Sequence, residues 1–257
     1  MSTQIETAFG KIVWHEHAST ASEEAKSFYS DLFGWELETF KPGEMDYTMI
    51  KANGRTHGGF SQPEGGAPPH WLHYVLVENA DETVRKATSA GADAIMKPFD
   101  VPDVGRLAVL ADPQGAVFAI IQPSMEGDTD TPPAEGVFVW DELMTTDVEG
   151  AKKFYAAVFG WSSFDNEMGG GMTYTLFRRN GEGSEVGGCM PRPEGVDAPS
   201  HWKPYIGTDD VDGTVAKAQE LGGTVLAEPA DIPGVGRFAV LQDPQGAPFG
   251  LLASSGE

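Results

Sequence analysis

Apolar residues recur along the chain with two periods, one typical of amphipathic helices and one typical of half-buried strands. Four of them at helical spacing predict a helix over residues 23–33. They are Ala25, Phe28, Tyr29 and Leu32. Thr20 or Ser22 is expected to cap the start of this helix and Gly34 to end it, because these residue types are preferred at those positions.

The other segments up to residue 123 are short apolar or alternating runs separated by glycine, proline and asparagine, which predicts strands. A second helix is expected over residues 80–90, and tight turns are expected at 53–54 and 112–115. The expected strands, in chain order, are 12–14, 35–40, 47–51, 58–61, 70–77, 94–96, 106–110 and 117–122. This order of elements predicts two βαβββ units.

The same pattern occurs a second time. The run Ala-Lys-Ser-Phe-Tyr at 25–29 recurs as Ala-Lys-Lys-Phe-Tyr at 151–155, an offset of 126 residues. The run Asp-Pro-Gln-Gly-Ala at 112–116 recurs unchanged at 243–247, an offset of 131 residues. A repeat this long indicates duplicated domains and not a solenoid of short units.

The repeat predicts a tandem α+β protein in which each copy is a pair of βαβββ units. The first copy spans residues 9–123 and the second spans residues 136–255, with helices expected at 148–159 and 211–221. The segment 124–135 between them is rich in proline, glycine, aspartate and threonine and has no apolar period, which is typical of a linker.

Composition and charge limit the classes of molecule that the chain is expected to bind. The chain has 257 residues and a formal net charge of −22, from 17 Lys+Arg against 39 Asp+Glu. Such acidity argues against nucleic acid and against an anionic membrane surface, because both are bound through basic side chains. A lone cysteine, Cys189, and the lack of a signal sequence or a long apolar run predict a cytoplasmic protein.

Motifs present in both copies suggest a family. Phe28-Tyr29, then Phe33-Gly34-Trp35, then the run at 112–115, resemble the vicinal oxygen chelate superfamily, which includes glyoxalase I, extradiol dioxygenases and bleomycin-resistance proteins. The duplicated layout resembles its two-domain actinobacterial branch of glyoxalase-like proteins, often labelled "hydroxylase". The resemblance implies that each pair of βαβββ units curls into a half-open barrel whose concave face lines a cavity.

The resemblance also indicates where metal ligands should lie. Metal enzymes of the superfamily place His, Gln or Glu on the first, fifth and last strands of a copy. The corresponding residues here are Trp14, Leu72 and Ala119 in the first copy and Trp140, Lys203 and Gly250 in the second. Since these side chains are poor ligands, we expect no metal and no other cofactor. A displaced ion held by Glu16 and His70 stays an alternative.

Paired aromatic residues predict what the concave faces bind. The expected lining is Trp14, Tyr47, Trp71, Tyr74 and Phe118 in the first copy, and Trp140, Tyr174, Trp202, Tyr205 and Phe249 in the second. His70, His201 and Lys203 complete the set of candidate ligand-binding residues. Such rings suit a flat, largely apolar ligand, although each could equally be an ordinary core residue.

Glu16 and Glu142 are the candidate catalytic residues. They share side-chain direction with Trp14 and Trp140, because alternate residues of a strand face the same way. A carboxylate in an apolar cavity suits a general base or acid, or an anchor for a ligand's amine or hydroxyl group. The structural alternative is that each carboxylate accepts bonds from neighbouring strands or pairs with an arginine, for which Arg106 and Arg237 are candidates.

Three functions follow from these features. The leading hypothesis is metal-independent binding of a small hydrophobic or aromatic molecule, in sequestration, in resistance or as an accessory to small-molecule metabolism. The alternative is an enzyme of the superfamily, a lyase, isomerase or oxygenase, with Glu16 and Glu142 as bases or as ligands of a displaced metal. A third is an accessory subunit of another enzyme. The pattern argues against a metal-dependent glyoxalase, and we expect a monomer with internal pseudo-dimer symmetry or a weak homodimer.

Overall fold

The structure is a computed structural model that describes residues 8–43, 46–62, 67–125, 133–168, 171–179, 185–193 and 198–255. Residues 126–132 of the expected linker therefore lie outside the described residues. The first copy consists of β1 (Ile12–Ala18), α2 (Ser22–Phe33), β2 (Glu36–Phe40), β3 (Tyr47–Ala52), β4 (Arg55–Ser61), β5 (His70–Leu76), α3 (Ala80–Ser89), β6 (Asp93–Val101), β7 (Gly105–Ala111) and β8 (Val117–Pro123).

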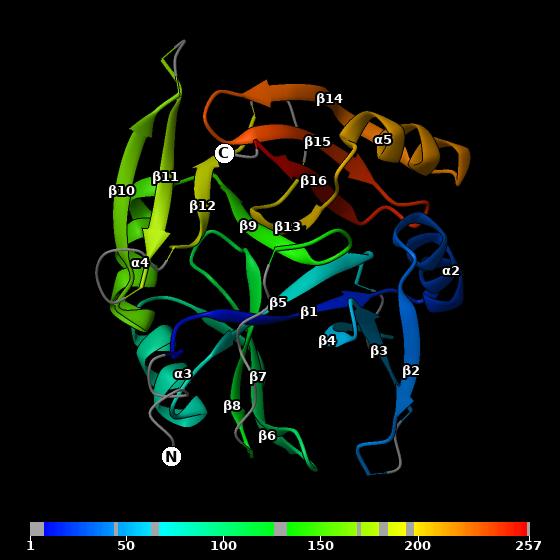
Figure 1. Ribbon diagram of the computed structural model, residues 1–257. Coiled ribbons are helices and arrows are strands. Elements are labelled where there is room, and N and C mark those ends of the chain that lie inside the picture. The colour runs from blue at the N-terminus through cyan, green and yellow to red at the C-terminus, as the bar shows by residue number, and fades with distance from the viewer. Residues whose placement is uncertain are drawn as a thin grey trace. The chain divides into compact units, whose positions relative to one another are not determined.

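The second copy repeats these elements in the same order (Figure 1). They are β9 (Phe138–Thr145), α4 (Val148–Phe159), β10 (Ser162–Glu167), β11 (Thr173–Arg178), β12 (Glu185–Pro191), β13 (His201–Gly207), α5 (Val211–Glu220), β14 (Thr224–Ile232), β15 (Gly236–Gln242) and β16 (Pro248–Ser254). None of the helices in the described part of the chain is long and apolar enough to cross a lipid bilayer.

Each copy forms one eight-stranded mixed sheet. The strand order is β2-β3-β4-β1-β5-β8-β7-β6 in the first and β10-β11-β12-β9-β13-β16-β15-β14 in the second. β1 pairs with β4 in parallel and β5 pairs with β8 in parallel, whereas the outer strands are antiparallel. The predicted tandem of paired βαβββ units is thereby confirmed.

Local sequence explains where the helices begin and end. α2 and α4 both end at a glycine in the left-handed region, Gly34 at φ 69° and Gly160 at φ 70°, as expected of a C-terminal cap. The expected cap of α2 by Thr20 or Ser22 is wrong, because Ala21 stands at the cap position and no side chain bonds there. α4 has the side-chain cap that α2 lacks, since Asp147 accepts a hydrogen bond from the Gly150 backbone.

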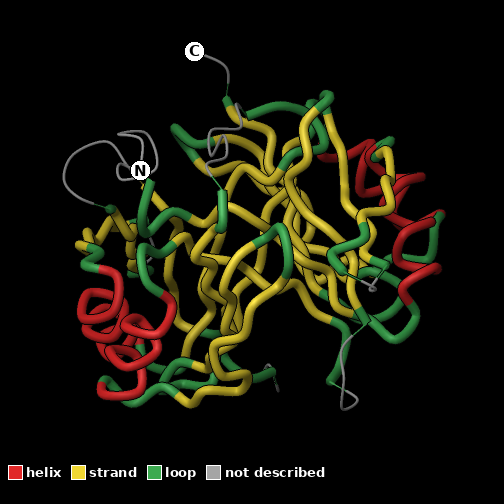
Figure 2. The backbone as a smooth tube through the Cα atoms, turned by 90° about the horizontal axis from the view of Figure 1, so that it is seen from below, coloured by secondary structure: helices red, strands yellow, loops and turns green. Residues whose placement is uncertain are grey.

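The chain packs into two compact units that cut across the copies, and each unit pairs one βαβββ half of the first copy with one of the second. Unit 1 contains the described residues of 1–13, 73–129 and 140–202, and unit 2 those of 14–72, 130–139 and 203–257. Helices α3 and α4 belong to unit 1 and α2 and α5 to unit 2, and the helices form two groups in Figure 2.

In unit 2 the repeated motifs of the first copy bond to turns of the second. The Tyr29 hydroxyl donates to Asp243 Oδ2 at 3.2 Å, and Trp71 Nε1 donates to the Tyr29 oxygen at 3.0 Å. Trp35 Nε1 donates to the carbonyl oxygen of Gly136 at 2.6 Å. All three aromatic rings lie in one buried cluster, so the core of this unit is built from both copies.

Unit 1 repeats the arrangement with the copies exchanged. The Tyr155 hydroxyl donates to Asp112 Oδ2 at 3.0 Å, Trp202 Nε1 donates to Tyr155 at 2.9 Å, and Trp161 Nε1 donates to the Gly10 carbonyl at 2.9 Å. The other carboxylate oxygen of Asp112 accepts backbone N–H groups of its own turn, as a turn aspartate does. Each Asp-Pro-Gln-Gly run is therefore both a turn and an acceptor for the other copy.

Candidate functional site

Strand alternation separates a core side from an open side of β1 and β9. The His17 ring lies 5.4 Å from the Tyr29 ring on α2, so the neighbouring Glu16 points to the opposite face of the sheet. On β9, Leu143 lies in the same buried cluster as Tyr155 of α4, so Glu142 likewise points away from the helix. Both candidate glutamates therefore point to the sheet face opposite the helix of their βαβββ unit.

Glu16 is the centre of a polar and aromatic group that we call the Glu16 cluster, made of Trp14, Glu16, Tyr47 and Ser61. The Tyr47 hydroxyl donates to Glu16 Oε2 at 2.9 Å, and Ser61 Oγ donates to Glu16 Oε1 at 2.8 Å. Trp14 Nε1 donates to the Tyr47 oxygen at 3.0 Å. All four side chains are partly exposed. Ser61, at the end of β4, was not among the predicted site residues.

A glycine makes this contact possible. Gly59 on β4 lies opposite Glu16 in the parallel pair with β1, and a β-carbon there would overlap the Tyr47 hydroxyl. The absence of a side chain lets the tyrosine of β3 reach across β4 to the glutamate of β1. The sequence signal for this reach is the Gly58-Gly59 pair within an otherwise regular strand.

Glu142 is the centre of an equivalent Glu142 cluster, made of Trp140, Glu142 and Tyr174. The Tyr174 hydroxyl donates to Glu142 Oε2 at 3.1 Å, and Trp140 Nε1 donates to Tyr174 at 2.9 Å. Burial, together with the nearby Glu142 carboxylate, raises the pKa of Tyr174 well above its ordinary value, so this hydroxyl stays protonated. Glu142 itself is only 6% exposed, in contrast to the partly exposed Glu16.

Three further predicted lining residues are buried on β5 and β13. Tyr74 lies opposite Ala119, and Tyr205 lies opposite Gly250. The Tyr205 ring covers the place that a β-carbon of Gly250 would take. Lys203 is also buried and holds its Nζ 5.1 Å from the centre of the Tyr205 ring, within range of a cation–π contact.

Four predicted lining aromatics lie elsewhere. They are Trp71, Phe118, Trp202 and Phe249, and each belongs to a buried core cluster. Trp71 and Tyr74 are three residues apart in one strand, so strand alternation sends them to opposite faces. Trp71 bonds to Tyr29 of α2, and Trp202 bonds to Tyr155 of α4. Alternation alone, applied strictly, predicts this division.

The predicted histidines of these strands have local partners. Nδ1 of His70 lies 2.8 Å from the Pro68 carbonyl oxygen, and Nδ1 of His201 lies 2.9 Å from the Pro199 carbonyl oxygen. Each histidine stands at the first residue of its strand and is partly exposed. Each bond therefore joins the histidine to the loop that precedes its strand.

The arginines proposed as partners of the glutamates pair with other carboxylates. Arg106 bonds to Asp81 and Asp100, at 2.7 and 2.9 Å. Arg237 bonds to Asp212 and Asp231, at 2.6 and 3.0 Å. In these ion pairs the carboxylates are those of aspartates, and neither Glu16 nor Glu142 is among them.

The residues at the positions where the family resemblance implies metal ligands are poorly suited to hold a metal ion. Trp14 and Trp140 use their indole N–H groups as donors to tyrosines, and an indole has no acceptor nitrogen to offer. The place next to Gly250 is filled by the Tyr205 ring. Within the described ranges, no group of three or more His, Cys, Asp or Glu side chains contains Glu16, Glu142 or His70.

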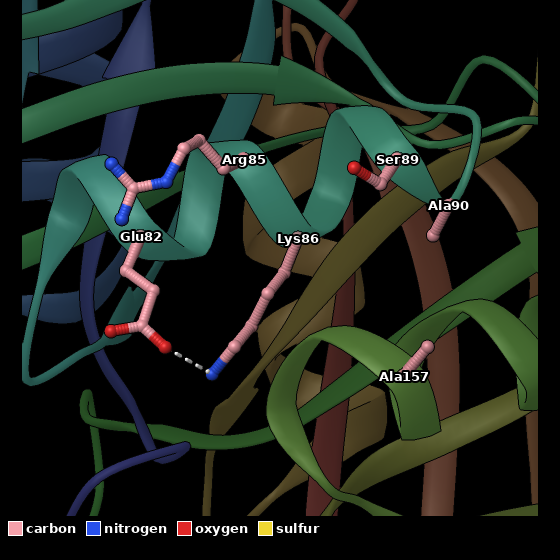
Figure 3. A pocket seen from close by; sticks show the side chains of 6 residues that line it. All are labelled: Glu82, Arg85, Lys86, Ser89, Ala90 and Ala157. Atoms are coloured by element: carbon pink, nitrogen blue, oxygen red, sulfur yellow. Dashed lines mark ion pairs between the residues drawn. The ribbon is translucent and has the colours of Figure 1, made fainter.

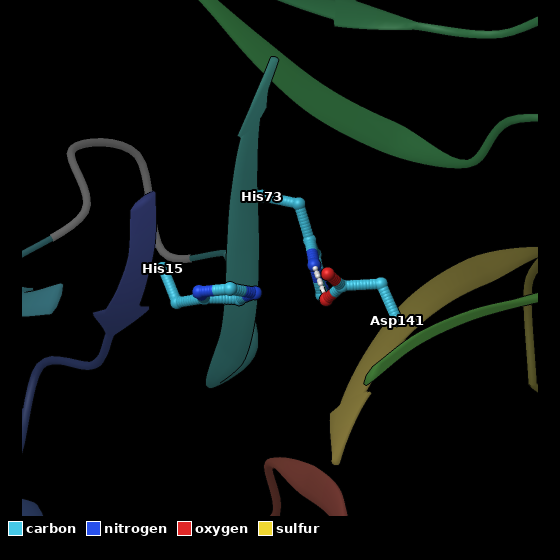
Figure 4. A group of neighbouring side chains, drawn as sticks. All are labelled: His15, His73 and Asp141. Atoms are coloured by element: carbon cyan, nitrogen blue, oxygen red, sulfur yellow. Dashed lines mark hydrogen bonds and ion pairs between the residues drawn. The ribbon is translucent and has the colours of Figure 1, made fainter. Parts of the chain in front are cut away.

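A histidine and an aspartate that the predictions passed over form a buried pair in unit 1. His73 Nδ1 lies 2.7 Å from Asp141 Oδ1, and their side chains are 1% and 10% exposed. Figure 4 shows the two side chains directed at each other from β5 and β9. His73 and Asp141 each directly precede a predicted site residue, Tyr74 and Glu142, so strand alternation sends them to the opposite face, the core side.

Cys189 is the lone cysteine of the chain. Burial raises the pKa of its thiol to about 12, which argues against a role as nucleophile.

Two surface hollows adjoin α3, and neither contains a predicted site residue. The first has a volume of about 580 Å³ and is drawn in Figure 3. It is lined by Glu82, Arg85, Lys86, Ser89, Ala90 and Ala157. The second, of about 240 Å³, shares Glu82 and Lys86 with the first and reaches Phe9 and Phe159.

Comparison with protein families gives one match in each copy. Residues 16–121 match a model described as a glyoxalase-like domain. Residues 138–251 match a model described as the glyoxalase/bleomycin resistance protein/dioxygenase superfamily.

Two curated relatives align over nearly the full length. CFP32 of Mycobacterium tuberculosis is 39% identical over 246 residues, which cover 93% of this chain and 93% of CFP32. The anthracycline biosynthesis protein DnrV of Streptomyces peucetius is 32% identical over 259 residues, which cover 95% of this chain and 93% of DnrV.

Solved structures with the same fold include a Mn(II)-bound glyoxalase and a dioxygenase. The Mn(II)-bound glyoxalase from Novosphingobium aromaticivorans aligns with a TM-score of 0.65 at 15% identity, over 96% of this chain and 82% of that one. The 2,2',3-trihydroxybiphenyl 1,2-dioxygenase from Sphingomonas wittichii aligns with a TM-score of 0.66 at 14% identity, over 96% and 91%. At these identities the likeness concerns the fold alone.

Proposed function

The chain belongs to the glyoxalase/bleomycin resistance protein/dioxygenase superfamily, and we propose that it binds a small organic molecule without a metal ion. The ligand is flat, largely apolar and aromatic, and it lies against the Glu16 cluster. The role is sequestration, resistance or an accessory step in small-molecule metabolism. The single observation that carries this proposal is that aromatic and aliphatic side chains occupy the positions where the resemblance implies metal ligands, beside the partly exposed residue Glu16.

The chemistry of the replaced positions supports binding without a metal. In the first copy they hold Trp14, Leu72 and Ala119, none of which offers a lone pair to a divalent cation. In the same copy Leu72 is buried, so the fifth-strand position carries packing and not a polar group. A site of this composition favours apolar contact over coordination.

The partly exposed rings of the Glu16 cluster support an aromatic ligand. The Trp14 and Tyr47 rings lie 6.4 Å apart between centroids with a 30° tilt, and both are partly exposed. An aromatic pair formed with a ligand contributes about 0.5–1.5 kcal/mol beyond the burial of apolar area. A relative of this chain, DnrV, is named for anthracycline biosynthesis, and anthracyclines are flat polycyclic aromatic compounds.

Titration of the metal-stripped protein tests the proposal. The full chain, dialysed against EDTA, is titrated with 2-naphthol, 1,4-naphthoquinone and riboflavin while the fluorescence of its six tryptophans is recorded. We expect saturable quenching by at least one compound, with a dissociation constant that added Mn²⁺ or Fe²⁺ does not change. If no compound quenches, or if quenching needs a metal, the proposal is wrong.

A second candidate function is catalysis by Glu16, and one observation favours it. Glu16 is a partly exposed residue whose carboxylate is oriented by hydrogen bonds from Tyr47 and Ser61, as a positioned general base must be. A lyase, isomerase or oxygenase of the superfamily would use it in this way. Conversion of a bound compound, followed by mass spectrometry and abolished by Glu16→Gln, would establish turnover, and stoichiometric Fe, Mn, Ni or Zn by elemental analysis would point to a displaced metal.

A further inference from the structure

The hollow of about 580 Å³ in unit 1 has no part in the proposed function. Its wall is formed by α3 together with Ala90, the residue that caps it, and by Ala157 of α4. Figure 3 shows the methyl groups of Ala90 and Ala157 directed toward each other from the two helices. The volume falls within the range of about 300–1,000 Å³ that is typical of small-molecule sites. The hollow is therefore large enough for a compound with one or two rings.

Two small residues leave this space between the helices. The repeat offsets of 131 and 126 residues place Leu221 and Asp31 of unit 2 at the positions of Ala90 and Ala157. Leucine and aspartate are both larger than alanine, so they would take up space that the two methyl groups leave free. The opening is thus a feature of the sequence of unit 1 and not a requirement of the fold that both units share.

The charge of the hollow is opposite in sign to that of the chain. Its wall carries two cations, Arg85 and Lys86, and one carboxylate, Glu82, whereas the chain as a whole has a net charge of −22. At the six equivalent positions of unit 2 the balance is reversed, with one cation and two carboxylates, which are Lys217, Asp31 and Glu220. The hollow of unit 1 therefore favours an anionic ligand.

Both cations can donate hydrogen bonds to such a ligand. Lys86 Nζ pairs with Glu82 Oε1 at 2.9 Å, and its side chain is 54% exposed. An ammonium has three donors, so Lys86 can bind a second carboxylate without releasing Glu82. Arg85 interacts electrostatically with Asp81 and Glu82, but no hydrogen bond within the described part of the chain involves its guanidinium group.

We propose that the hollow between α3 and α4 of unit 1 binds a small organic monoanion, a carboxylate on an apolar body. The carboxylate accepts charge-assisted hydrogen bonds from Lys86 and Arg85, and the apolar body covers the methyl groups of Ala90 and Ala157. A single net positive charge matches one carboxylate better than a phosphate dianion. The residues of this site belong to unit 1 and those of the Glu16 cluster to unit 2, so the inference does not rest on the proposed function.

A matched pair of ligands tests the role of charge. The full chain is titrated by calorimetry at low salt with 2-naphthoate and with 2-naphthamide, which has the same rings and no charge. We expect one site for 2-naphthoate and an affinity about tenfold or more above that for the amide, the factor that a hydrogen bond to a charged group provides. High salt should remove this preference, because it screens exposed charges.

Two variants place the residues of unit 2 into unit 1. Ala157→Asp adds a negative charge and should weaken the binding of 2-naphthoate at least tenfold, with a smaller effect on the amide. Ala90→Leu fills the hollow and should weaken both ligands. Lys86→Ala removes a donor and should weaken 2-naphthoate alone, whereas Lys97→Ala, which removes an exposed lysine of β6, is the matched control and should leave the affinity unchanged.

The two proposals fail separately. Equal affinity for 2-naphthoate and the amide, binding that neither Ala157→Asp nor Ala90→Leu weakens, or no binding at all overturns this inference. The proposed function is tested with uncharged compounds through tryptophan fluorescence, and no tryptophan lines the hollow, so its result is independent. Circular dichroism checks that each variant folds, and should Ala90→Leu fail to fold, Ala157→Asp and Lys86→Ala decide the outcome.

Discussion

Two aspartates at equivalent positions differ in their surroundings because of one residue. Asp243 Oδ2 accepts from Tyr29 and lies 2.7 Å from His17 Nε2, in a fully buried contact. In unit 1 Leu143 occupies the position equivalent to His17, and Asp112 Oδ2 accepts a hydrogen bond from Tyr155. Burial raises the pKa of Asp112 above its usual value. A leucine therefore stands in unit 1 at the position from which an imidazole contacts the carboxylate in unit 2.

The raised pKa of Asp112 predicts a pH-dependent effect of Asp112→Asn. A carboxyl whose folded pKa is raised contributes stability below its unfolded pKa of about 3.9, and that contribution is lost as pH rises through the folded pKa. Asparagine has no such loss. As the pH rises from about 4 to about 7, the unfolding free energy of wild type should therefore fall relative to that of Asp112→Asn. Urea unfolding at a series of pH values measures it, and a shift in favour of wild type would contradict the assignment.

Asp243→Asn is the matched control for this experiment. It keeps the turn acceptor but removes the charge beside the buried His17 ring. Because a hydrogen bond to a charged group is worth about 1.5–3 kcal/mol, we expect Asp243→Asn to cost more than Asp112→Asn at pH 7. An equal cost in the two copies would show that His17 adds nothing to the contact.

At the scale of elements, the helix pair α2 and α5 of unit 2 and the pair α3 and α4 of unit 1 differ in the hydrogen bonds made by an equivalent lysine. In unit 2, Lys217 Nζ of α5 donates to the carbonyl oxygen of Leu32 in the last turn of α2, at 3.2 Å. The equivalent lysine of α3 in unit 1, Lys86, pairs with Glu82 on its own helix at 2.9 Å. In α5 the position equivalent to Glu82 is Gly213, so Lys217 has no glutamate there to pair with. The hollow of about 240 Å³ beside Lys86 lies between residues of α3 and α4.

This difference predicts unequal effects of the two lysines. Lys217→Ala removes a hydrogen bond between helices that satisfies a terminal carbonyl, and it should lower the unfolding free energy by about 1 kcal/mol. Lys86→Ala removes an exposed pair within one helix and should leave stability within experimental error. Thermal unfolding of both variants checks this, and an equal loss in both would contradict the role given to Lys217.

The hydrophobic pattern predicted well where helices and strands lie, but it did not predict which elements they contact. The helix over residues 80–90 and the ends of two helices at Gly34 and Gly160 follow from local propensity and appear in the structure. Helical period shows which side of α2 is apolar, but it cannot show that Tyr29 reaches a turn of the other copy. The same limit explains Trp71, which was grouped with Tyr74 on aromatic character although alternation places the two on opposite faces.

The candidate site was predicted in part for the same reason. Trp14, Glu16 and Tyr47 were expected together on one face, and hydrogen bonds join them. Ser61 was missed because its contact depends on the parallel pairing of β4 with β1, which joins residues 45 positions apart. Pairing of this kind depends on sheet topology, and periodicity within a single strand carries no information about it.

At the scale of the whole molecule, each unit's core is shared between the two copies. Tyr29, Phe28 and Phe249 are among its fully or nearly fully buried members in unit 2, and the last belongs to the second copy. Exposing one such side chain costs about 1.5–3 kcal/mol, against a typical net stability of about 5–15 kcal/mol. A single copy, separated from its neighbour, would expose several such side chains at once, so we expect it not to stay folded alone.

Fragments test this sharing. Residues 8–125 and 133–255, expressed separately, should fold only by association, so their thermal midpoints should rise with protein concentration. Mixing the two should restore the near-ultraviolet circular dichroism of the full chain, whose own midpoint should be independent of concentration. A fragment that unfolds cooperatively at a concentration-independent midpoint would show that one copy is a self-sufficient domain.

The bonds from Tyr29 to Asp243 and from Tyr155 to Asp112 bear on how genes of this kind can recombine. The segment 124–135 looks like the natural breakpoint for exchanging halves between related genes. A crossover there would bring each tyrosine opposite an aspartate that had evolved beside a different sequence. Chimaeras joined at this point should therefore carry the greatest penalty where the parents differ at the position of His17, and a compensating mutation should arise in the opposite half of the gene.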